Sequence, residues 1–123
     1  MHRYECVISS RTTAAPQTLF DLVADGARWS KWAAPLIPYS RWESLSPAGD
    51  SGVGTIRAVG RRKRPTREMV TIHEPPGRHG YTMLVDGPIR DYQAEVTFVE
   101  GSGGTEVTWR GRYETRWRAV GMA

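Results

Sequence analysis

The chain has 123 residues, a length typical of a single domain. Hydrophobic residues make up 39% of it and charged residues 24%, a globular composition that excludes collagen-like, coiled-coil and disordered proteins. The formal net charge of +4 is a moderate excess rather than the charge of a polycation.

The first third of the sequence predicts one strand followed by two helices. Polar and apolar residues alternate over 4–13, which is typical of a half-buried strand. Pro16 then opens a stretch with apolar residues at helical spacing, and proline is favoured in the first helical turn. A second short helix is expected over 27–34, where the three-residue spacing of Trp29 and Trp32 puts both indoles on roughly one face.

The remainder of the chain predicts six successive antiparallel strands. Each apolar run alternates with period two, and clusters of Gly, Pro, Asp and Ser separate one run from the next. No internal repeat and no linker divides the chain. The expected strands cover residues 39–45, 54–62, 67–74, 79–85, 91–99 and 106–114.

The basic residues are concentrated in one expected hairpin. Five of the 17 lysines and arginines lie close together, and the rest of the chain is near neutral. Such a loop can hold phosphates or anionic lipid headgroups, although a solvated hairpin tip is the commoner case. The anion-binding candidates are Arg61, Arg62, Lys63, Arg64 and Arg67.

Three segments resemble a known family in their order and spacing. They are residues 15–32, residues 74–81, which include Glu74-Pro75-Pro76-Gly77-Arg78, and residues 103–109. Together they resemble the polyketide cyclase/dehydrase and lipid-transport superfamily, the SRPBCC proteins with a START-like or Bet v 1-like fold. The resemblance covers essentially the whole chain. It implies one α+β helix-grip domain over 1–123, with a curved antiparallel sheet of about seven strands and two short helices after the first strand.

The end of the chain departs from this family. Family members close the open side of the sheet with a long C-terminal helix, which this sequence lacks because it stops at 120–123, just after the last strand. A truncated chain, a disordered helix or a cover supplied by a partner would each explain the difference. An uncovered aromatic face favours aggregation. We therefore expect either a homodimer or part of a longer protein.

The resemblance also implies an apolar ligand pocket between the sheet and the helices. Pockets are mostly apolar with a few placed polar groups, and tyrosine supplies both characters. Simple core packing is the better interpretation of any one of these residues, whereas a pocket is favoured for the set. The expected wall consists of Trp32, Tyr39, Trp42, Met69, Tyr81, Met83, Tyr92, Ala94, Trp109 and Tyr113.

Several kinds of site have no support in the sequence. The single cysteine, Cys6, excludes an intrachain disulfide, and the three histidines have no metal-ligand spacing, so we expect neither a metal nor a cofactor. No nucleophile elbow or phosphate-binding loop is present. The first residues lack the features of a secretory signal, and no apolar run reaches the roughly 20 residues that span a bilayer. We expect a cytoplasmic protein.

Acid–base catalysis is left with two weak candidates, Asp91 and Glu95. A carboxylate buried beside an apolar ligand would have a raised pKa and could act as a base. Asp91 lies near a turn, however, where aspartate is common for local hydrogen-bonding reasons. The family shares no single catalytic set, so the resemblance assigns no active site.

Three functions follow, in order of preference. The first is binding or transport of a small lipid-like or polyketide-like molecule. The second is an enzyme of the cyclase or dehydratase type acting on an aromatic or acyl substrate. The third is a protein- or RNA-interaction module that uses the basic loop over 61–67, although nucleic acid is not the expected partner of a chain with this modest charge.

Overall fold

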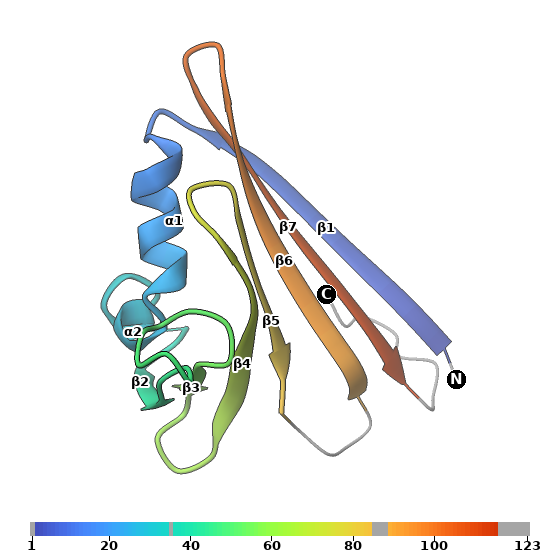
Figure 1. Ribbon diagram of the computed structural model, residues 1–123. Coiled ribbons are helices and arrows are strands. Elements are labelled where there is room, and N and C mark those ends of the chain that lie inside the picture. The colour runs from blue at the N-terminus through green and yellow to red at the C-terminus, as the bar shows by residue number, and fades with distance from the viewer. Residues whose placement is uncertain (1, 35, 85–88, 116–123) are drawn as a thin grey trace.

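A single seven-stranded antiparallel sheet forms the body of the molecule, which the computed structural model describes for residues 2–34, 36–84 and 89–115. The strands lie in the order β1-β7-β6-β5-β4-β3-β2, so each strand after β2 pairs with its predecessor and β1 joins β7 (Figure 1). The elements in chain order are β1 (His2–Thr12), α1 (Pro16–Ala24), the 3-10 helix η1 (Gly26–Arg28), α2 (Trp29–Trp32), β2 (Tyr39–Ser44), β3 (Ile56–Gly60), β4 (Pro65–Glu74), β5 (Arg78–Met83), β6 (Ile89–Gly101) and β7 (Gly104–Thr115).

This architecture confirms the expected helix-grip α+β fold, with a seven-stranded sheet and short helices after the first strand. The second helix differs from the expectation of 27–34. Helix α2 has a single turn, closed by the hydrogen bond from the Ala33 amide to the Trp29 carbonyl oxygen. The Ile37 amide then donates to the Ala33 carbonyl oxygen in a further turn that leads the chain into β2. The turn residues 86–88, between the strands expected over 79–85 and 91–99, lie outside the described residues.

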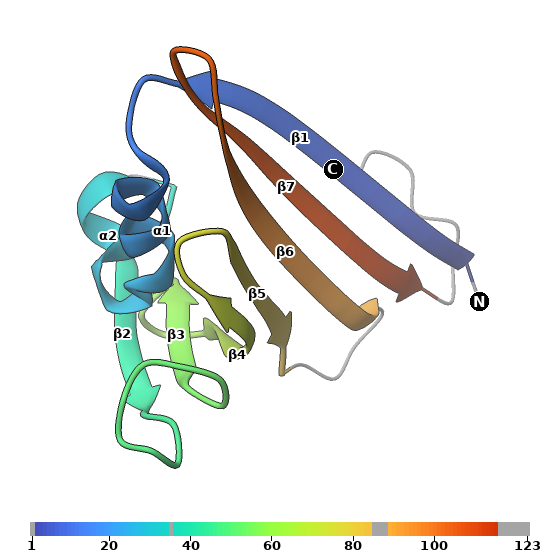
Figure 2. The same ribbon diagram turned by 45° about the horizontal axis from the view of Figure 1, so that its top comes forward.

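The sheet has two distinct faces, which we call inner and outer. The inner face is the one that α1 and α2 cover, and the long strands β1, β7 and β6 curve past these helices (Figure 2). Helix α1 contacts β5 and β6, where Phe20 and Val23 join Val96 and Phe98 in the buried core. Directly opposed residues on neighbouring strands share a face, so the ladder registers assign the paired residues of each strand to one side, and alternation along the strand assigns neighbours such as Tyr92.

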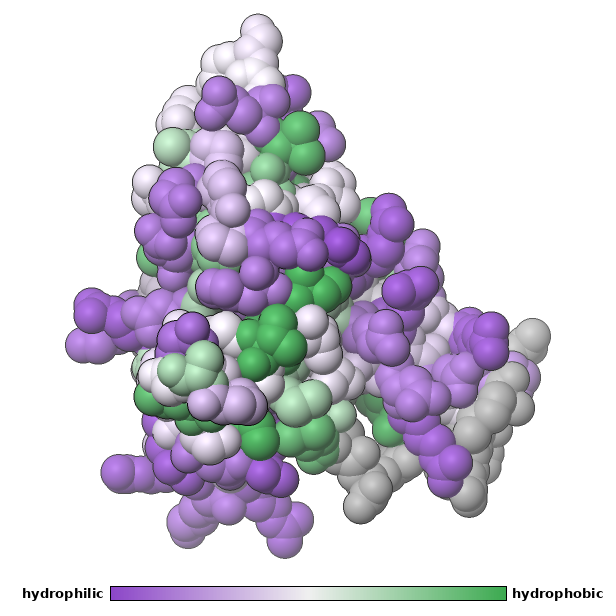
Figure 3. Space-filling view, in the orientation of Figure 1, coloured by the Kyte–Doolittle hydropathy of each residue, from purple (hydrophilic) through white to green (hydrophobic). Residues whose placement is uncertain are grey.

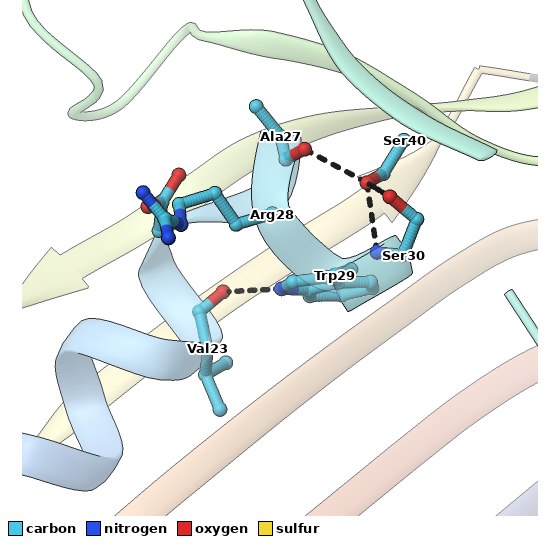
Figure 4. A network of polar contacts seen from close by, with 7 residues as sticks. Val23, Ala27, Arg28, Trp29, Ser30 and Ser40 are labelled. Atoms are coloured by element: carbon cyan, nitrogen blue, oxygen red, sulfur yellow. Dashed lines mark hydrogen bonds and ion pairs between the residues drawn. The ribbon is translucent and has the colours of Figure 1, made fainter. Parts of the chain in front are cut away.

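A small polar network fixes the helical segment against the sheet (Figure 4). The indole Nε1 of Trp29 donates a hydrogen bond to the carbonyl oxygen of Val23 at 3.0 Å, which ties α2 to the end of α1. The hydroxyl of Ser40 on β2 accepts from the Ser30 amide at 2.9 Å and lies 2.8 Å from the carbonyl oxygen of Ala27. These contacts hold Trp29, which is 3% exposed, over the inner face.

The hairpin between β6 and β7 packs tightly against the end of β1. A Cβ atom on Gly104 would clash with the backbone carbonyl oxygen of Thr12, whereas one on Gly103 would meet nothing within 4 Å. We expect Gly104→Ala to lower the free energy of unfolding by about 1–3 kcal/mol beyond the cost of Gly103→Ala, because the clash forces strand β1 to shift. Urea unfolding of both variants measures the difference. Equal losses would show that only backbone conformation matters here.

Candidate functional site

Four tyrosines form a continuous row across the inner face. Tyr81 on β5, Tyr92 on β6, Tyr113 on β7 and Tyr4 on β1 follow one another with ring centroids 6.4, 6.3 and 5.4 Å apart. The planes of the last two pairs differ by only 24° and 19°, so these rings stack. The row exists because the ladder registers bring one tyrosine from each strand to the same face. It offers a series of aromatic surfaces with phenolic hydroxyls.

One end of this row meets a buried guanidinium. The Arg57 side chain on β3 is 0% exposed, and its Cζ atom lies 4.0 Å from the ring centroid of Trp29 and 4.4 Å from that of Tyr81. Its Nε donates to the Glu68 carboxylate on β4 at 3.0 Å. Glu68 stands directly opposite Arg57 in the ladder and is itself buried. The inner face therefore contains a buried ion pair enclosed by aromatic rings.

His79 is the third polar member of this buried cluster. Its Nε2 lies 3.3 Å from Nη1 of Arg57, and because a guanidinium can only donate, this ring nitrogen accepts. The proton of the neutral imidazole must then sit on Nδ1. Among the described residues, neither His79 Nδ1 nor Arg57 Nη2 has a hydrogen-bond partner although both atoms are buried. The cluster therefore keeps two unused donors at one end of the tyrosine row.

Burial dominates the protonation equilibria of this region. It lowers the pKa of His79 to about 3, with the Arg57 charge and His73 adding to the effect. It also raises the pKa of the Glu68 carboxyl, against the opposing influence of Arg57. Burial raises the pKa of Tyr81 and Tyr92 as well. The phenols and the imidazole are therefore neutral at physiological pH and can act as hydrogen-bond donors.

A hollow of about 510 Å³ lies on strands β1, β7 and β6, and most of its lining residues belong to the outer face of the sheet. Its lining includes Tyr4 and Tyr113 and is otherwise polar. This volume lies within the range of about 300–1,000 Å³ that small-molecule sites occupy. The other lining residues are Arg3, Glu5, Asp91, Gln93, Arg112 and Glu114.

The structure brings most of the expected wall residues together, but not all of them. By ladder register, Tyr39 and Met69 lie on the outer face, opposite Gly60 and Ile56. Trp32 lies on α2, is 46% exposed, and touches the inner cluster only through the edge of Trp29. The residues placed on the inner face are Trp42, Tyr81, Met83, Tyr92, Ala94, Trp109 and Tyr113.

The two catalytic candidates lie apart from each other. Asp91 lines the 510 Å³ hollow. Glu95 lies on the outer face, where Arg78 donates to it at 2.5 Å and holds the pKa of its carboxyl below the ordinary value. A carboxylate with a lowered pKa is a poor general base, and Glu95 lies on the opposite face of the sheet from the tyrosine row. No group of three or more His, Cys, Asp or Glu side chains in the described ranges could hold a metal ion.

Sequence reasoning missed Arg57, Glu68, His79 and Tyr4. The signal for the ion pair was present, because alternation over the strand expected at 54–62 puts Arg57 on the same face as Val59, and both side chains are buried. An arginine on a buried face requires a partner, and the opposite position on the next strand is the first place to look. Tyr4 carried no distinguishing signal, because its position in the row depends on the pairing of the first strand with the last.

The fold is similar to several solved structures, all of them less than 25% identical to this chain, so these likenesses show the fold alone. The crystal structure of Ara h 8.0201 matches with a TM-score of 0.75 and 15% identity over 97% of this chain and 82% of the other. The di-domain ARO/CYC protein BexL, from the BE-7585A biosynthetic pathway, matches with a TM-score of 0.74 and 17% identity over 93% of this chain and 37% of its own length. A START superfamily protein from Mycobacterium smegmatis matches with a TM-score of 0.69 and 12% identity over 95% of this chain and 81% of the other.

At the level of sequence, the model of the family described as "Polyketide cyclase / dehydrase and lipid transport" matches residues 5–123. No curated protein matches the chain. In the part of the chain that the structure describes, no helix is long and apolar enough to cross a membrane.

Proposed function

Because this chain belongs to the polyketide cyclase/dehydrase and lipid-transport family, we propose that it binds a small, flat apolar molecule beside the tyrosine row of the inner face. The row of four tyrosines, joined by three ring contacts, is the observation that carries this proposal. Stacked rings favour a planar, unsaturated ligand over a flexible acyl chain, because an aromatic ligand gains ring–ring contacts at little cost in conformational entropy.

The open part of the inner face supports this location. Helix α1 contacts β5 and β6, whereas Ile8 on β1 is 62% exposed. Ile8 stands directly opposite Trp109, which is only partly buried. An apolar ligand lying on this part of the sheet would cover both side chains, and the neutral phenols beside it would donate hydrogen bonds to its carbonyl or hydroxyl oxygens.

Titration with 2-naphthol, a flat hydroxylated aromatic probe, tests the proposal. We expect the probe to quench tryptophan fluorescence and to bind roughly fivefold to a hundredfold more weakly when Tyr4→Leu and Tyr92→Leu are combined, since each ring contact contributes about 0.5–1.5 kcal/mol. Tyr39→Leu is the matched control, because Tyr39 is also half-buried but lies on the outer face. Equal affinity in both variants, or tighter binding of decanoic acid than of 2-naphthol, would contradict the proposal.

One observation favours the enzyme alternative. The unpartnered Nη2 of Arg57 is a cationic donor beside the tyrosine row, and a preorganised guanidinium stabilises negative charge that develops on an enolate or alkoxide oxygen. The same titration with 1-phenylbutane-1,3-dione separates the two functions. Recovery of the dione with unchanged mass supports binding alone, whereas hydrolytic cleavage of its carbon–carbon bond, with water consumed to give benzoic acid and acetone or acetophenone and acetic acid, would establish an enzyme.

A further inference from the structure

Four consecutive cations in the turn between β3 and β4 have no acidic partner. The group, which we call the basic hairpin, is Arg61–Arg64, and all four side chains are exposed. Among the described residues, none of them takes part in an ion pair, whereas the nearby Arg67 is held by Glu43 through Nη2 at 2.6 Å. The hairpin lies at the lower end of the molecule in the view of Figure 1, where Figure 3 shows strongly hydrophilic side chains projecting outward. Its charge is therefore available to an external anion.

A highly exposed large apolar side chain lies at the same end of the sheet. Tyr39, the first residue of β2, pairs with Gly60, the last residue of β3. The residues just before Tyr39 and just after Gly60 therefore emerge side by side. Leu36 is 89% exposed there, in a turn closed by the hydrogen bond from the Ile37 amide to the Ala33 carbonyl oxygen at 3.0 Å.

We infer that this end of the sheet docks on the surface of a bilayer that contains anionic lipids. The basic hairpin supplies the attraction to phosphate headgroups, and Leu36 supplies an apolar side chain that can enter the interface. A nucleic acid would use the cations but would leave Leu36 in water, so the pair of features favours a lipid surface. The inference is independent of what the inner face binds.

Sedimentation of the full chain with lipid vesicles tests this inference. We expect binding to vesicles of equal parts phosphatidylglycerol and phosphatidylcholine, little binding to phosphatidylcholine alone, and weakening as salt rises. Each cation near the surface adds a factor of roughly five to the partition coefficient. Combining Arg61→Gln, Arg62→Gln, Lys63→Gln and Arg64→Gln should then lower binding by several hundredfold, on the order of four such factors.

A charge-matched control separates local docking from net charge. It combines Arg3→Gln, Arg11→Gln, Arg110→Gln and Arg112→Gln, four exposed cations on the outer face of β1 and β7. Its binding to the anionic vesicles should fall by less than roughly tenfold. Leu36→Ser should bind the anionic vesicles roughly tenfold more weakly while its binding keeps the same salt dependence. Circular dichroism confirms that each variant is folded.

Three outcomes would overturn the inference. Equal losses in the two quadruple variants would show that only net charge matters. Binding of the chain to polyuridylate with no binding to anionic vesicles would assign the hairpin to nucleic acid. An unchanged affinity for Leu36→Ser would remove the apolar contribution that distinguishes a membrane from other anions.

Discussion

Replacing Arg57 with methionine is expected to lower the free energy of unfolding by about 3–5 kcal/mol at pH 7, because the Glu68 carboxylate is then left buried without its partner. The arginine is 0% exposed and Glu68 is 7% exposed, so water cannot replace the lost ion pair without opening the sheet. The cation–π contacts with Trp29 and Tyr81 are lost in the same substitution. Urea unfolding at pH 7 measures the change.

The pH dependence identifies Glu68 as the cause. Burial already raises the pKa of this carboxyl in the folded protein above 4.5, and removing Arg57 raises it further. At Glu68 the folded variant then binds more protons than the unfolded chain above pH 4.5, so the deficit in unfolding free energy relative to the wild-type protein shrinks as the pH is lowered from 7 toward 4.5. Combining Arg57→Met with Glu68→Leu should recover most of the loss at pH 7. A loss that is the same at both pH values would contradict the assignment.

Acidification is expected to destabilise the protein through His79. Its pKa is about 3 in the folded protein and 6.5 in the unfolded chain, because burial and the charge of Arg57 oppose protonation. Between these values the unfolded chain binds more protons, so stability falls as the pH falls from 6.5 toward 3. Each pH unit in this range lowers the free energy of unfolding by about 1.4 kcal/mol, and the full loss of unfolding free energy is on the order of 3–5 kcal/mol.

His79→Gln tests this dependence directly. The glutamine carbonyl oxygen can still accept from Arg57 but cannot be protonated, so the slope of stability against pH over this range should flatten. His2→Gln is the control, since His2 is exposed on β1 and should leave the slope unchanged. Unfolding by urea at a series of pH values measures both variants. If His79→Gln kept the wild-type slope, the acid sensitivity would have to originate elsewhere.

The strand order and the fold could be predicted because period-two alternation, turn residues and a family resemblance all point the same way. The alternation identifies two faces of each strand but not which of them is inside. On β4 it groups Glu68 with Val70 and Ile72, and Met69 with Thr71, and the expected wall took Met69 because methionine is buried more often than glutamate. The structure buries Glu68 instead, because Arg57 opposite supplies its counter-charge.

The same limit explains Tyr39. On β2, Tyr39 alternates with Ser40, and the inner position goes to Ser40 because its hydroxyl bridges Ala27 and Ser30 in the helical segment. That contact joins segments that only the folded chain brings together. The pairing of Arg57 with Glu68 was easier to predict from the sequence, since a turn centred between Arg62 and Lys63 places the two residues opposite each other. Residues whose roles depend on side-chain chemistry across strands were therefore the ones missed.

The pairing of β1 with β7 has a consequence for biosynthesis. The two strands match over eleven residue pairs, from His2 with Thr115 to Thr12 with Thr105, and the hydroxyls of Ser9 and Thr108 lie 3.1 Å apart although 99 positions separate them in sequence. Strand β1 leaves the ribosome well before β7, so this edge of β1 stays unpaired until β7 has been synthesised. Pairing of the two strands is thus a late step of folding with a large loop-closure entropy.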